Sequence, residues 1–508
     1  MRSAFLMSCV LMTSVISGCG SGSGAVSGGN GGSGGGSTEN VPSLTSIKPS
    51  LALAGSPDTI LTVAGSNFLS GATVLWNGSG LQTTWLSSSL LSASLPSSDL
   101  VTAGSGQITV SNPSPDGGTS NIQVFTIKAD PPPTWIRTVP GVTFPVAGAQ
   151  DIVVDSAREK LYIAMASTDP AYPNSVISVN PVTSTVENSV VAGSGPNLLS
   201  ISSDSSFLWA GLNGDYAVQR FLLPGLTKDV SFQMPSTQRG GTQQAVCLEA
   251  APVNPHTIAL IAGSWTITPP GNGVYVYDDT AQRSTSVPGW GAGGGPEIDW
   301  IQWGSDDSTI YGDEYSTIDT GGISKLSINS TGVTYVATYG GTNVLPGIMQ
   351  YNKSNGLLYG NDAAYLPGAN GPVGEFNLPG PGYVACTADS SLGRYFCATG
   401  YDEGNSNVAL FELWVYDLNS YAFINRVNFG WRSEGTGSGT ALFTGEMQYL
   451  VRWGNAGLAL TTVDTGMGFG NGGVFLFDGN AINPNLPPDV STGTLGSPCL
   501  DETSDCVL

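Results

Sequence analysis

Residues 152–163 read Ile-Val-Val-Asp-Ser-Ala-Arg-Glu-Lys-Leu-Tyr-Ile. Two short apolar runs flank a polar, charged turn, a pattern that is typical of a β-hairpin. A third apolar run, Val176–Val179, follows in the same segment. This three-part unit returns along the chain, and a unit that returns at a regular spacing predicts a repeat architecture.

The unit occurs seven times between residues 134 and 488, at about 51 residues per unit, which is the length of a propeller blade. The paired runs lie at 152–163, 199–210, 246–260, 300–311, 348–359, 384–397 and 450–460. Third strands are expected at Val176–Val179, Ala217–Leu222, Val274–Tyr277, Gly322–Leu326, Val373–Phe376, Ala409–Tyr416 and Gly473–Phe477. We therefore predict an all-β chain with a seven-bladed β-propeller of four-stranded blades, although the spacing also allows six or eight.

The seventh unit has no evident fourth strand. We expect Trp135–Val139 to complete it and so to close the ring, because closure removes exposed sheet edges. In the first unit, Lys160–Ala164 and Asn174–Pro181 resemble the YVTN-type propeller repeats of bacterial surface proteins, as does Gly195-Pro196-Asn197 before the second unit. Later units depart from that pattern.

Residues 42–128 alternate short apolar runs with Gly, Pro, Asn and Ser clusters, which indicates an immunoglobulin-like β-sandwich. Strands are expected at 44–47, 60–63, 73–76, 91–95, 107–110 and 124–127. The segments Leu44–Pro49, Leu61–Phe68, Val110–Pro113 and Gly117–Ile127 are similar to those of the IPT/TIG family. This resemblance implies a spacer or protein-interaction module. A Pro-rich connector at 129–133 leads to the propeller, and 489–508 form a C-terminal tail.

The N-terminus has the layout of a secretory signal, because Arg2 precedes an apolar run that reaches Ile16 and is short for a bilayer span. The run ends in Ile16-Ser17-Gly18-Cys19, which resembles the bacterial lipobox. The resemblance implies a signal peptide at 1–18, acylation of Cys19, and release to the outer membrane, since Gly20 follows. Residues 19–41 then hold the lipidated Cys and a flexible Gly/Ser tether. An ordinary signal peptide with an accidental Cys is the alternative.

Composition excludes several classes of function. Lys and Arg number 16 against 38 Asp and Glu, which gives a net charge of −22. Nucleic acid needs a concentrated positive patch, so it is not expected as a partner. The single histidine, His256, excludes His-based triads and multi-histidine metal centres. No motif indicates a metal site or a cofactor, and none are expected.

The cysteines predict disulfides that suit an extracellular compartment. Cys386 and Cys397 fall on the two strands of one hairpin, where a cross-strand bond is geometrically feasible. Cys499 and Cys506 are expected to close a small loop in the tail. Cys247 is then a buried free thiol. A catalytic Cys247 is the alternative, since His256 lies in the same hairpin.

The loops between second and third strands emerge on the face that also carries the interblade loops, and we call this face the mouth. These loops contain no Lys or Arg, and each carries an aromatic residue. The candidate ligand-binding residues are Trp265, Tyr315, Tyr365, Tyr401, Asp313, Glu314, Asp402 and Glu403, with Trp290 and Trp431 from interblade loops. Aromatic rings give apolar area, and acids focus a field that attracts cations. The alternative is that the aromatics pack between blades and the acids solvate turns.

These features favour a binding or interaction lipoprotein of the bacterial cell envelope, anchored by its lipid in the outer membrane or at the cell surface. Its propeller would present a face to a protein or glycan ligand, without catalysis. A propeller hydrolase or lyase that acts on an extracellular polysaccharide is the alternative, because paired carboxylates can come from different blades. A structural subunit of a surface assembly is a third class.

The lipobox resemblance generates a first prediction. Cys19→Ala removes the thiol that accepts the lipid, so the variant is expected in the soluble fraction after cell lysis, whereas the unaltered protein sediments with membranes. Immunoblotting of both fractions measures this. A Cys19→Ala protein that sediments entirely with membranes and resists salt extraction contradicts the lipid anchor.

Overall fold

The computed structural model of the protein describes residues 41–56, 58–114, 117–129, 134–135, 148–235, 243–264, 271–289, 296–314, 322–339, 348–360, 362–369, 371–378, 383–402, 408–433, 446–463, 473–477 and 482. Within these ranges the regular elements are strands, apart from a short 3-10 turn at Ser97–Asp99. The described residues contain no helix that is long and apolar enough to span a membrane. Cys19, Cys499, Cys506 and the tether lie outside the described residues.

The first folded part is a sandwich of two sheets. One sheet has the order β1 (Ser43–Lys48), β3 (Thr59–Ser66), β7 (Leu90–Leu95) and β6 (Gln82–Ser87). The other has the order β2 (Leu51–Leu53), β9 (Gln123–Lys128), β8 (Gly104–Ser111), β4 (Thr73–Trp76) and β5 (Ser79–Gly80). In β7, Leu91, Ala93 and Leu95 are buried, since alternate side chains of a strand share one face. All six expected strands are present, and β2, β5 and β6 are additional.

Asn112 explains part of the sandwich motif. It is buried, and its side chain accepts a hydrogen bond from Leu69 N (3.1 Å) and donates one to Asn67 O (2.6 Å). Asn67 has a positive φ of 60°, which asparagine tolerates better than most residues. The amide of Asn112, from the segment Val110–Pro113, therefore holds the turn that follows β3, and so links the segments Val110–Pro113 and Leu61–Phe68 of the motif.

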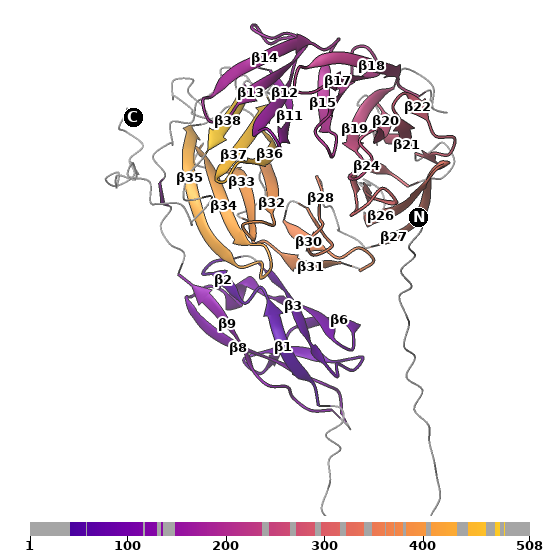
Figure 1. The fold of residues 1–508 in the computed structure, drawn as a ribbon. Coiled ribbons are helices and arrows are strands. Elements are labelled where there is room, and N and C mark those ends of the chain that lie inside the picture. Colours follow the sequence, from indigo (N-terminus) through magenta and orange to yellow (C-terminus); the bar gives the residue numbers. More distant parts are fainter. Residues whose placement is uncertain are drawn as a thin grey trace, which may run out of the picture. The chain divides into compact units, whose positions relative to one another are not determined.

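The second folded part consists of seven sheets arranged in a ring, which confirms the β-propeller (Figure 1). Blades one to three are formed by β11 (Ala149–Asp155), β12 (Lys160–Met165), β13 (Ser175–Asn180) and β14 (Thr185–Val191); β15 (Pro196–Ile201), β16 (Phe207–Leu212), β17 (Ala217–Leu222) and β18 (Thr227–Gln233); and β19 (Gln244–Ala250), β20 (Thr257–Gly263), β21 (Gly271–Asp278), β22 (Ala281–Gln282) and β23 (Val287–Pro288).

Blades four to seven complete the ring. They are formed by β24 (Ile298–Trp303), β25 (Thr309–Glu314), β26 (Gly322–Asn329) and β27 (Gly332–Tyr339); β28 (Gln350–Asn352), β29 (Leu357–Tyr359), β30 (Ala363–Tyr365) and β31 (Pro372–Glu375); β32 (Tyr383–Asp389), β33 (Arg394–Asp402), β34 (Val408–Asp417) and β35 (Phe423–Ser433); and β36 (Glu446–Trp453), β37 (Gly457–Val463) and β38 (Gly473–Phe477).

Position within a blade determines the residue pattern of each strand. The second strand of blade three, β20, is buried at every residue because the adjacent blades cover both of its faces. A continuous apolar run is the expected sequence for such a strand. The outer strand β14 is mostly exposed and carries Glu187 and Asn188. The inner strands β36 and β11 contact each other, and one apolar cluster includes Ile152 and Trp453, so side-chain packing closes the ring between blades seven and one.

Two expectations about the blades are wrong. Thr134–Trp135 form the short strand β10, which pairs in parallel with Val427 and Asn428 of β35 and so extends blade six, not blade seven. Residues 136–139, the remainder of the expected closing strand, lie outside the described part. In blade five, the third strand is β30, and the segment expected there, Val373–Phe376, belongs mostly to the fourth strand β31.

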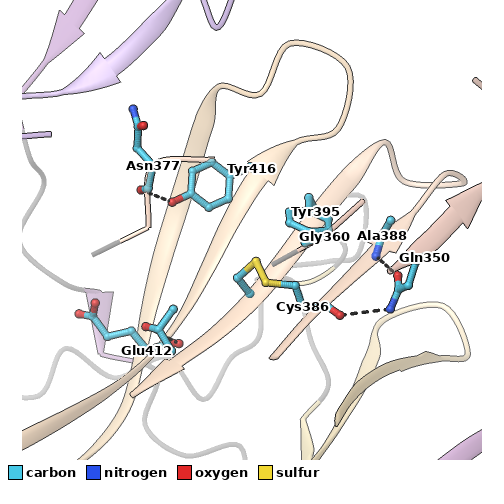
Figure 2. Close-up of a disulfide and its surroundings, with 10 residues drawn as sticks. Gln350, Gly360, Asn377, Cys386, Ala388, Tyr395, Glu412 and Tyr416 are labelled. Atoms are coloured by element: carbon cyan, nitrogen blue, oxygen red, sulfur yellow. Dashed lines mark hydrogen bonds between the residues drawn. A yellow bond between two sulfur atoms is a disulfide. The ribbon is translucent and has the colours of Figure 1, made fainter. Parts of the chain in front are cut away.

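Blade six contains the pairing that the hairpin spacing predicts. Cys386 of β32 and Cys397 of β33 lie opposite each other, with 4.1 Å between their Cα atoms, and form a disulfide (Figure 2). Beside the disulfide, the Gln350 side chain reaches the main chain of β32. Cys247 is a buried free thiol.

Candidate functional site

The inner strand of each blade turns one edge toward the centre of the ring, where the sheet has no further strand. Backbone groups on such an edge need other partners. Side chains of adjacent blades supply several of them. The hydrogen bonds are Leu199 N to Asp151 Oδ2 (2.6 Å), Ala250 N to Ser200 Oγ (2.8 Å), Trp303 Nε1 to Glu249 O (3.0 Å), Ala388 N to Gln350 Oε1 (2.9 Å) and Gln350 Nε2 to Cys386 O (3.2 Å).

Five inner strands share a second feature, an irregularity in pairing near the mouth end. In each of these strands one extra residue interrupts the register, as between Ala149 and Asp151 of β11. Such a bulge re-aims the side chains that follow it. The residues directly after the extra residue are Asp151, Leu198, Cys247, Trp300 and Tyr449.

Four of these residues, with Glu249, form what we call the channel cluster: Asp151, Cys247, Glu249, Trp300 and Tyr449. The ring centroids of Trp300 and Tyr449 are 6.5 Å apart. These rings come from blades four and seven, which are not neighbours, so they meet across the centre of the propeller. Trp300 Nε1 is buried without a hydrogen-bond partner among the described residues.

Burial dominates the electrostatics of the channel cluster. It raises the pKa of Asp151 to about 7, although hydrogen bonds from Leu199 N and Ile152 N, both 2.6 Å, oppose the rise. Burial, and then the negative charge of Asp151, raises the pKa of Glu249 to about 8. Burial and Glu249 also raise the pKa of the Cys247 thiol, so Cys247 stays protonated and is a poor nucleophile.

The two acids differ in what they can do. The two oxygens of Asp151 accept hydrogen bonds from Ile152 N of blade one and Leu199 N of blade two, so this carboxylate links the two blades. Glu249 keeps part of its surface exposed, and its raised pKa means that it holds its proton near neutral pH. A carboxylic acid of that kind can donate a proton. No group of three or more His, Cys, Asp or Glu in the described ranges is arranged to hold a metal ion.

The structure places the predicted mouth residues in three situations. Asp313 and Tyr365 are buried, and the charge of Asp313 contributes to raising the pKa of Tyr365, so the two lie near each other. Glu314, Tyr401 and Asp402 are at the ends of β25 and β33, and Trp431 is in β35. Trp265, Trp290, Tyr315 and Glu403 lie outside the described residues.

Tyr365 is a correction to the predicted set. It belongs to the third strand of blade five and packs with Tyr311, Ile323 and Met349 in an apolar cluster between blades four and five. An aromatic side chain in that position stabilises the packing of the blades and offers no surface to a ligand. For this residue the alternative stated above, packing between blades, is correct.

The acids of the described mouth loops also act within the fold. Asp169 is buried and accepts hydrogen bonds from Ala171 N (2.9 Å) and Tyr172 N (2.6 Å). Asp215 accepts one from Ser194 N (2.7 Å), which ties a second-to-third loop to the preceding interblade loop. Both carboxylates shape the loops, but Asp169 is buried and Asp215 is exposed, so of these two charges only that of Asp169 is withdrawn from the surface of the mouth.

Comparison with protein-family models matches residues 42–127 to the IPT/TIG domain. This segment is an IPT/TIG domain. The match ends at residue 127 and leaves the propeller unmatched. No curated protein matches the sequence.

Solved structures that resemble the chain include propellers of low sequence identity. "Structure of U3-55K" is 11% identical, with 66% of this chain and 96% of that chain covered and a TM-score of 0.45. The Cps50 (Swd1) beta-propeller domain of Myceliophteria thermophila is 10% identical, with 66% and 99% covered and a TM-score of 0.43. An auxiliary nutrient binding protein from Bacteroides thetaiotaomicron is 11% identical, with 86% and 98% covered and a TM-score of 0.32. At these scores none of them indicates a function.

The raised pKa of Glu249 predicts a pH dependence of stability. The folded state binds this proton more tightly than the unfolded chain, whose pKa is about 4.5, so the free energy of unfolding falls as pH rises from 5 to 8. Glu249→Gln removes the part of the fall that this carboxyl causes, on the order of 3 kcal/mol. Urea unfolding followed by tryptophan fluorescence at pH 5 and pH 8 measures the difference.

The matched control is Glu187→Gln on the exposed strand β14. Lys160, 2.5 Å away, lowers the pKa of Glu187, so that carboxylate is largely ionised in both states over this range and its removal changes the slope little. If Glu249→Gln and the unaltered protein lose equal stability between pH 5 and pH 8, the raised pKa of Glu249 is wrong.

Proposed function

We propose that the protein is a non-catalytic binding lipoprotein of the bacterial cell envelope, whose propeller presents a protein or glycan ligand-binding face. The observation that carries the proposal is the approach of Trp300 and Tyr449, whose rings meet across the centre of the propeller with centroids 6.5 Å apart. Together with the structural use of Asp151, it leaves the two faces of the propeller as the surfaces open to a partner.

The mouth is the face that we assign to the ligand. Trp265 and Tyr315 belong to its expected loops and Tyr401 lies at the end of β33, and aromatic side chains combine apolar area with a polar tip at recognition surfaces. The lipid on Cys19 and the Gly/Ser tether would hold this face away from the membrane, and the IPT/TIG domain would serve as a spacer. No cofactor is required for such a role.

The triple variant Trp265→Ala, Tyr315→Ala and Tyr401→Ala tests the mouth. On an array of bacterial surface polysaccharides and envelope proteins, the unaltered protein is expected to give a signal that weakens with added salt. The binding signal of the triple variant should be at least about tenfold weaker, and its unfolding temperature should be unchanged. Tyr335→Ala, an exposed ring on the outer strand β27, is the control that should bind normally. Undiminished binding by the triple variant places the ligand elsewhere.

A hydrolase or lyase that acts on an extracellular polysaccharide is the second candidate. Glu249 favours it, since its raised pKa keeps a proton that a general acid could give to a leaving group. Release of new reducing ends from a polysaccharide, lost in Glu249→Gln and kept in Glu187→Gln, would support catalysis. If the unaltered protein releases none, this candidate is excluded for the polymers tested.

A further inference from the structure

A cleft of about 420 Å³ lies between blades five and six. Residues 350–354, from β28 and its following turn, line one side, and Ala388 and Ser390 of blade six line the other. These turns join first to second strands, so the cleft is on the face opposite to the mouth. Its volume is within the range of small-molecule sites, roughly 300 to 1,000 Å³.

Two side-chain amides, that of the half-buried Gln350 and that of the buried Asn352, hold the two sides of the cleft together. Gln350 bonds to Cys386 O and Ala388 N of the adjacent blade, as Figure 2 shows. Asn352, 6% exposed, accepts hydrogen bonds from Ser354 Oγ (2.7 Å) in its own turn and from Ser390 Oγ (2.8 Å) across the blade boundary. The cleft is therefore formed before a ligand arrives, which lowers the ordering cost of binding.

The serine hydroxyls define what the cleft can recognise. Each has one hydrogen, and both hydrogens are directed to Asn352 Oδ1, so Ser354 and Ser390 offer acceptor lone pairs to a ligand. A ligand that carries donors, such as sugar hydroxyls, satisfies these acceptors. A sulfate dianion, which only accepts, does not.

Charge gives the second criterion. Lys353 is the charged residue of the lining, it is exposed, and it has no ion-pair partner among the described residues. The neighbouring acid Asp389 is paired with Arg452 at 2.7 Å and does not neutralise it. Tyr351, whose ring is stacked against Tyr311 with centroids 5.8 Å apart, adds an aromatic wall with a polar tip.

We propose that this cleft binds a hexuronate, a sugar whose carboxylate contacts Lys353 and whose hydroxyls donate to Ser354 and Ser390. The site lies on the other face of the propeller from the mouth, so it does not depend on the function proposed above.

Isothermal titration calorimetry on the full-length protein tests the proposal with three probes: sodium D-galacturonate, D-galactose and sodium sulfate. Galactose has the same ring without the carboxylate, and sulfate has charge without donors. Galacturonate is expected to bind at least tenfold more tightly than either. Equal affinity for galactose, tighter binding of sulfate, or no binding of galacturonate overturns the proposal.

Variants locate the site. Lys353→Gln should weaken galacturonate binding about tenfold and remove its preference over galactose, and Ser390→Ala should weaken binding of both sugars. Lys228→Gln, an exposed lysine on β18, should change nothing. The mouth triple variant should also bind galacturonate normally. Binding that survives Lys353→Gln but fails in the mouth variant overturns the cleft and leaves the mouth as the site.

Discussion

The inner strands of the seven blades each turn one edge toward the centre of the propeller, and within the part of the chain that the structure describes no further strand pairs with that edge. Their amides and carbonyls cannot all be left without hydrogen bonds in a packed interior. Asp151, Ser200 and Gln350 satisfy some of them from adjacent blades. Because each such bond crosses a blade boundary, the same groups that satisfy the edge also fix one blade against the next. The raised pKa of Asp151 is one result, since a carboxyl used in this way must be buried.

The blades were predictable because the strands that two neighbours cover, such as β20, appear in the sequence as unbroken apolar runs. Blade five was harder. Its third strand is only the three residues Ala363–Tyr365 between turn-forming residues, so Tyr365 appeared to be a loop residue. The parallel pairing of β10 with β35 also has no sequence signal, since two residues carry no periodicity.

Neither the channel cluster nor the cleft could be predicted from the sequence, and the reasons differ. The channel cluster depends on a one-residue bulge, which leaves the apolar pattern of the strand nearly unchanged but redirects Trp300 and Tyr449. The sequence does carry one signal: the polar residue Glu249 interrupts the apolar run of the inner strand β19. The cleft is formed by two turns from different blades. Its sequence Asn352-Lys353-Ser354 is that of an ordinary polar turn, and only the fold shows that Ser390 lies beside it.

Each arginine whose side chain the structure describes is held in an ion pair: Arg158–Asp155, Arg220–Asp229, Arg283–Asp278, Arg394–Asp417, Arg426–Glu412 and Arg452–Asp389. The protein has a net charge of −22, so an anion that diffuses toward it meets repulsion at long range and Lys353 only at close range. Salt shortens the reach of both fields, to about 8 Å at physiological ionic strength. Added salt would therefore speed the arrival of an anion at the cleft while it weakens the contact made there, so that encounter rate and residence time respond in opposite directions.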